Sequence, residues 1–222
     1  MSATMASLKS VGGPWRGAIL PSVDSPRGTT GVVFGMNARL ESPRTATFAG
    51  IDTSALRPVL PGLLLAVLTL LLGFALGVVF GLNEDLIKSR LSASATTSAS
   101  TVYQQDPQAM KAVLDKSWTY MQRSHLHAGS LGTTAIALTV VVVLLGTGAR
   151  IATTISVALG AGGLGYSLFW VWAGFRAPAL GGTGAAKESL AWLAVPSAAL
   201  VVASTLAVAV LLVNAMRERR AA

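Results

Sequence analysis

Four long runs without a charged residue are the most constraining feature of this sequence. They cover residues 58–83, 124–149, 151–175 and 189–216, and each is 25 to 28 residues long. A helix needs about 20 apolar residues to cross a hydrocarbon core of about 30 Å. Because every run is mainly apolar and exceeds that length, each can cross a bilayer with some tilt. The sequence therefore predicts an integral membrane protein with four transmembrane helices.

The composition agrees with a membrane location and excludes several kinds of site. Charged residues make up 12% of the chain and hydrophobic residues 52%, whereas an ordinary soluble domain has about 25% charged residues. The chain has no cysteine, which excludes disulfides, thiolate metal sites and cysteine nucleophiles. The net charge is +8, but the basic residues are scattered. We therefore expect membrane lipids, and no nucleic acid, as partners.

The chain divides into three parts. Residues 1–57 are rich in Ser, Thr, Gly, Pro and Arg and poor in acidic residues, so we expect a disordered segment. Its composition partly resembles that of a targeting peptide; alternatively, translation starts at Met36. Residues 58–216 form the predicted membrane domain, and residues 217–222 form a basic tail.

The connection after the first run predicts helices longer than the bilayer. Glu84–Leu91 can prolong the first helix, and the Ser/Ala/Thr tract 92–101 is typical of a linker. Asp106 and Pro107 then predict a helix N-cap followed by proline at the first helical position. No helix breaker follows until about Leu145. We therefore predict an all-α fold, a four-helix transmembrane bundle in which helices 1 and 2 extend beyond the bilayer as a hairpin.

Small residues recur at three- or four-residue spacing in three of the spans. Such faces let two membrane helices approach closely, although glycine is also generally common in membrane helices. The predicted packing residues are Gly73, Gly77 and Gly81 in the first span, Gly129 and Gly132 in the second, and Ala199, Ala203 and Ala207 in the fourth.

The two histidines of the chain, His125 and His127, lie together at the start of the second run. Polar residues that enter a membrane helix are candidates for function, although contacts with water or headgroups can also satisfy an imidazole at the boundary. Two positions on an α-helix differ by roughly 200°, so the two rings point to nearly opposite faces. One metal or haem iron shared by this pair would need local unwinding or a histidine from each of two chains.

The two histidines differ in their neighbours on the helix. His125 falls on an apolar stripe, so we expect it to hydrogen-bond across a helix–helix contact. His127 falls on a more polar face with Tyr120 and Arg123, and these residues complete the set of candidate ligands or polar contacts. Neither histidine has an acidic residue nearby, so no hydrolase constellation is evident, and the metal, if any, is unknown.

The stretch 116–132 carries a pattern of the form KSWxYxxRxHLHxG. It is similar to a motif of uncharacterised small bacterial membrane proteins. The resemblance covers about residues 58–215 and implies four helices with an extended loop between the first two. It carries no assigned activity.

Together these features favour a non-enzymatic structural or accessory membrane component that packs through Gly and Ala faces, as a homo-oligomer or a subunit of a larger complex, without a cofactor. One alternative is a haem- or metal-linked redox protein that uses His125 and His127 at an inter-chain site. Another is a small transporter, although no span contains a charged residue. We expect a bacterial inner membrane location, with both termini in the cytoplasm. With both termini in the cytoplasm, 10 Lys and Arg residues lie inside and 7 outside; counting those near the spans alone makes the two sides equal.

Overall fold

A computed structural model of the protein describes residues 53–221, which contain no strand. Four helices are long and apolar enough to cross a membrane, which confirms the predicted all-α four-helix bundle of a multi-pass membrane protein. Of the segment 1–57, the part up to residue 52 lies outside the described residues. The elements are η1 (Thr53–Val59), α1 (Leu60–Thr97), α2 (Pro107–Leu144), α3 (Ala149–Arg176), α4 (Thr183–Glu188) and α5 (Ala191–Ala221).

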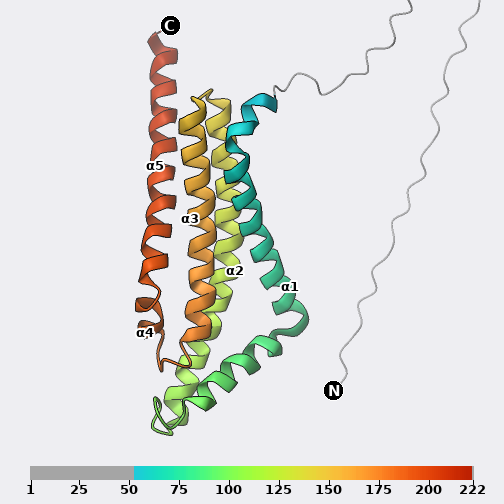
Figure 1. The fold of residues 1–222 in the computed structure, drawn as a ribbon, viewed down its shortest axis with the longest axis vertical. Coiled ribbons are helices and arrows are strands. Elements are labelled where there is room, and N and C mark those ends of the chain that lie inside the picture. Colours follow the sequence, from blue (N-terminus) through green and yellow to red (C-terminus); the bar gives the residue numbers. More distant parts are fainter. Residues whose placement is uncertain (1–52, 222) are drawn as a thin grey trace, which may run out of the picture. The chain divides into compact units, whose positions relative to one another are not determined.

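Helix α3 lies at the centre of the bundle (Figure 1). It packs against α1, α2 and α5, whereas α1 and α5 do not contact each other. In its most apolar stretch, half of the residues of α3 are buried, compared with 17% for α1 and 11% for α5. Helix α5 is therefore held along one side, and most of its surface is free within the chain.

Glycines set the distance between α1 and α2. A Cβ atom on Gly132 would lie 3.0 Å from the carbonyl oxygen of Ala66 and 2.8 Å from Cγ of Leu70. A Cβ atom on Gly73 would lie 3.0 Å from the backbone nitrogen of Gly129. Because backbone atoms cannot move aside as a flexible side chain can, the two helices require glycine at positions 73 and 132.

Two of the predicted packing glycines do not have this role. Nothing lies within 4 Å of the position of a Cβ atom on Gly81 or on Gly129. The backbone of Gly129 borders the contact, but a side chain at this position would point into open space. The four-residue glycine pattern of the first run therefore makes close contact at Gly73 and Gly77, and it leaves Gly81 outside that contact.

Glycines of α3 also allow close approach to its neighbours. A Cβ atom on Gly160 would lie 2.6 Å from the carbonyl oxygen of Gly62 in α1, and one on Gly162 would lie 2.8 Å from the carbonyl oxygen of Ser197 in α5. These two positions lie on different faces of α3, which explains how one helix can approach two neighbours closely.

Helix α1 bends sharply at Asn83, whose φ of −158° and ψ of 68° are not helical. The Asn83 side-chain oxygen Oδ1 accepts a hydrogen bond from the backbone N–H of Leu86 at 3.1 Å, so Asn83 caps a new helical segment, 84–97. Glu84 and Asp85 in its first turn also favour a helix N-terminus. The expected extension of the first helix is present, but it crosses the end of the bundle instead of continuing along the helix axis (Figure 1).

The prediction of a linker over residues 92–101 is wrong for its first part, because α1 continues to Thr97. Ile87, Leu91 and Ala95 recur every four residues and are buried, and the first two pack with Met121 of α2. Burial of this stripe outweighs the weak helix preference of the Ser and Thr residues on the exposed side.

Helix α2 starts where the sequence predicts. Asp106 accepts hydrogen bonds from the two backbone N–H groups that follow Pro107, and the helix continues to Leu144, one residue short of the predicted end. In the preceding turn the hydroxyl of Tyr103 donates to the carbonyl oxygen of Pro178 at 2.7 Å. Burial raises the pKa of Tyr103, so the hydroxyl keeps its proton and fixes this turn to the connection after α3.

Replacing Gly132 by Ala should destabilise the protein by about 1–3 kcal/mol, because the added methyl group collides with the backbone of α1. The matched control is Gly129→Ala, which adds the same methyl group three residues away in open space and should be neutral or slightly stabilising through its helix propensity. Melting temperatures of the two variants in one detergent check this. Equal melting temperatures would contradict the assigned role of Gly132.

Candidate functional site

The structure places the two histidines on different sides of α2. His125 faces α1, where its Nδ1 lies 2.8 Å from the carbonyl oxygen of Gly73. Because a carbonyl oxygen can only accept, Nδ1 carries the proton and donates. This is the hydrogen bond across a helix–helix contact that the sequence predicts for His125.

Neighbouring residues on α1 shape the space for this imidazole. A Cβ atom on Gly77 would lie 2.8 Å from Cε1 of His125, so glycine leaves room for the ring. Phe80 meets the ring edge-on, with ring centroids 5.8 Å apart. Thus Gly73 supplies the acceptor, Gly77 the space and Phe80 an apolar wall.

His127 faces α3 and joins an aromatic cluster. Its ring stacks on Tyr166 with centroids 5.3 Å apart and meets Trp170 edge-on at 5.8 Å. The guanidinium carbon of Arg123 lies 5.2 Å from the ring centre of Trp170 and 5.5 Å from that of Tyr120. We call these five residues the aromatic cluster.

Helical spacing explains how the cluster forms. Tyr120, Arg123 and His127 lie three and four residues apart and therefore share one face of α2, while Tyr166 and Trp170 are four apart on α3. The spacing in the sequence predicts the grouping of the three residues of α2. Tyr166 and Trp170 lie outside that prediction, although their four-residue spacing is a signal of a shared helix face.

Two polar groups of the cluster lack the usual protein partners. Arg123 is exposed, and the ion pairs of the described residues are Lys88–Glu84 and Lys111–Asp115, so neither includes it. Within residues 53–221, Nε1 of Trp170 is the buried side-chain nitrogen that has no hydrogen-bond partner. A buried donor without a partner typically costs about 1–3 kcal/mol.

This geometry limits what the histidines can bind. Since one ring contacts α1 and the other α3, His125 and His127 do not converge on a common point. The described part of the chain contains no group of three or more His, Cys, Asp or Glu residues that could hold a metal ion. His125, with Nδ1 bound to a carbonyl oxygen, could offer its Nε2 as one ligand per chain.

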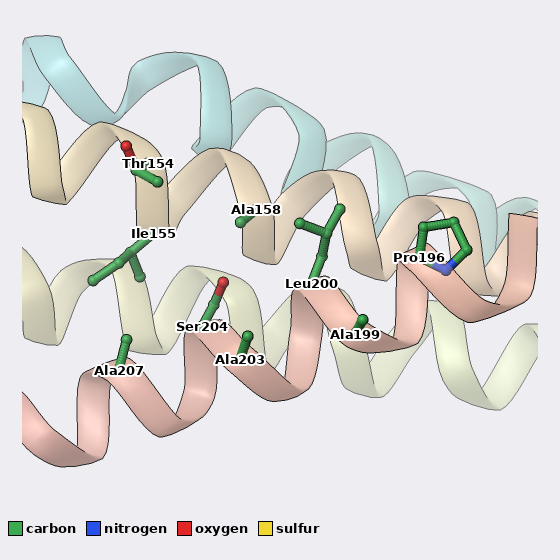
Figure 2. A pocket seen from close by; sticks show the side chains of 9 residues that line it. All are labelled: Thr154, Ile155, Ala158, Pro196, Ala199, Leu200, Ala203, Ser204 and Ala207. Atoms are coloured by element: carbon green, nitrogen blue, oxygen red, sulfur yellow. The ribbon is translucent and has the colours of Figure 1, made fainter.

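The three predicted packing alanines lie along a groove between α3 and α5 (Figure 2). Ala199 and Ala203 are exposed and Ala207 is half-buried, so this face is largely unused within the chain. The groove has a volume of about 570 Å³. Its other lining residues are Thr154, Ile155, Ala158, Pro196, Leu200 and Ser204.

Replacing His125 by Leu should lower the stability in detergent by about 1–2 kcal/mol, because the carbonyl oxygen of Gly73 loses its second donor in apolar surroundings. His125→Asn should retain most of the stability, since its amide N–H₂ can take the place of Nδ1. Thermal melting of both variants checks this. A His125→Leu protein that melts with the native one would show that the hydrogen bond contributes nothing.

No protein-family model, curated protein or solved structure matches this chain. The resemblance of residues 116–132 to small bacterial membrane proteins therefore stays a prediction. What this protein does has to be inferred from its own residues and their arrangement.

Proposed function

We propose that this protein is a non-enzymatic structural or accessory component of the membrane that associates with a second copy of itself through the groove between α3 and α5. The observation that carries the proposal is the position of α5. This 31-residue helix packs along one side on α3 and leaves a small-residue face, with Ala199 and Ala203 exposed, next to that contact.

Bulky and small residues lie on adjoining stripes of the free surface of α5. Val195, Val202 and Leu206 are 58–66% exposed, and bulky branched side chains of this kind suit contact with lipid tails. The alanines lie next to these residues, toward the groove, which they line together with Ala158 of α3. Small residues favour contact with another helix over contact with lipid, because they let the two backbones approach closely.

A second copy is the occupant that the chain itself favours. Within one molecule the helices already associate through small residues, such as Gly162 of α3 against Ser197 of α5. In a dimer with two-fold symmetry the same groove meets itself, so two alanine faces come together. Self-association thus repeats between copies the kind of packing that the bundle uses internally.

A haem- or metal-linked redox role is the second candidate, favoured by one observation. The Nδ1 hydrogen bond to Gly73 orients His125 as protein partners orient metal-ligating histidines. Two copies could each supply one such ligand. A Soret band or stoichiometric metal that is lost in His125→Leu would establish this role. The third candidate from the sequence, a small transporter, has no support among the described residues.

We place the protein in a bacterial inner membrane with both termini in the cytoplasm. The support for this orientation is the count of Lys and Arg over the whole sequence, 10 on the side of the termini and 7 on the other. Positive residues near span ends favour the cytoplasmic side.

The absence of cysteine from the whole chain allows a clean cross-linking test of self-association. Ala203→Cys should form a disulfide-linked dimer when membranes are oxidised, because the position lies on the groove. Val202→Cys, its sequence neighbour on the lipid-facing side, is the matched control and should remain monomeric. Gel mobility without reductant measures both. Equal cross-linking of the two variants, or a product with a different protein alone, would contradict a specific dimer.

Single cysteines also test the orientation. Ser100→Cys lies in the exposed turn before α2 and should react with a membrane-impermeant maleimide in spheroplasts. Ala149→Cys lies at the opposite end of the bundle and should react after permeabilisation alone. The reverse labelling pattern would place the termini outside.

A further inference from the structure

The aromatic cluster contains several hydrogen-bond donors that the described residues do not satisfy. Arg123 lies over the rings of Trp170 and Tyr120 and is in neither ion pair of the described chain. Its charge is therefore held in place by aromatic faces and remains available to an anion.

Two further donors accompany Arg123. Nε1 of Trp170 is buried and has no hydrogen-bond partner within residues 53–221. The imidazole of His127 stacks on Tyr166, and residues 53–221 provide no hydrogen bond to its ring nitrogens. His125, two positions away, differs because its Nδ1 is hydrogen-bonded to Gly73.

The place of the cluster along α2 indicates what could approach it. Arg123 is the last charged residue before the uncharged run 124–149, so it lies where the helix enters the hydrocarbon region. Trp and Tyr side chains gather at this level, beside lipid headgroups. Trp192, which is 66% exposed at the start of α5, belongs to the same end of the bundle.

We propose that the aromatic cluster binds the phosphate group of an anionic lipid headgroup. The guanidinium of Arg123 can donate two parallel hydrogen bonds to phosphate oxygens. The imidazole of His127 supplies a further donor at the edge of the same site, and the buried indole N–H of Trp170 lies within the same cluster. The proposal does not depend on self-association, because the groove is lined by other residues of α3 and α5.

Native mass spectrometry of the purified full chain in a neutral detergent tests this site. Dioleoylphosphatidylglycerol should bind saturably to the native protein, and Arg123→Gln should weaken that binding about tenfold. The matched control is Arg176→Gln, which removes the same charge from another exposed position at this end of the bundle and should leave the affinity unchanged. Trp170→Phe keeps an aromatic ring but removes the N–H, so it should weaken binding by a smaller factor.

Two further arms identify the source of the phosphate. Dioleoylphosphatidylcholine, whose headgroup is zwitterionic, should bind more weakly than phosphatidylglycerol, and inorganic phosphate should not compete at equal concentration. Equal weakening by Arg123→Gln and Arg176→Gln would reveal diffuse attraction and overturn the site. Binding of inorganic phosphate that depends on Arg123, without lipid binding, would overturn the lipid assignment. Melting curves of all variants establish that each one is folded.

Discussion

The close approach of helix backbones at small residues is the constraint on which this fold depends. In lipid the apolar side chains gain little by leaving their surroundings, so helices associate through tight packing and through polar contacts between them. Gly132 and Gly73 allow α1 and α2 to touch, and Gly160 and Gly162 let α3 approach a different neighbour on each of two faces. The central position of α3 follows from these contacts.

The polar contact at His125 depends on the same approach. Gly73 is both a residue that lets α2 come near and the acceptor for Nδ1, and Gly77 leaves space for the ring. A larger residue at either position would separate the helices and lengthen the hydrogen bond. Packing and hydrogen bonding therefore depend on the same residues at this crossing, and Nδ1 of His125 has its hydrogen-bond partner there without water.

The features that can be predicted from the sequence are those that neighbouring residues determine. Run length predicts the four helices, and Asp106 with Pro107 predicts the start of α2. The turn at Asn83 had a local signal, an Asn before two acidic residues, but the helix over 92–97 depends on burial against Met121 of α2. Likewise, spacing groups Tyr120, Arg123 and His127, whereas their contact with Trp170 depends on how α2 and α3 align. Such alignment is non-local, which is also why Gly81 and Gly129 could not be told from the glycines that make contact.

Some polar and small residues of the bundle have partners inside it and others do not, and the two groups lie on different sides of α2 and α5. On the α1 side, His125 has its partner and serves the interior of the bundle. On the α3 side, Arg123 has no ion-pair partner and Nε1 of Trp170 has no hydrogen-bond partner in the described chain. The largely exposed alanines of α5 contrast in the same way with the glycines at positions 73, 132, 160 and 162, which lie in contacts inside the bundle. These are the two surfaces for which we propose partners, an anionic lipid headgroup at the aromatic cluster and a second copy of the chain at the groove.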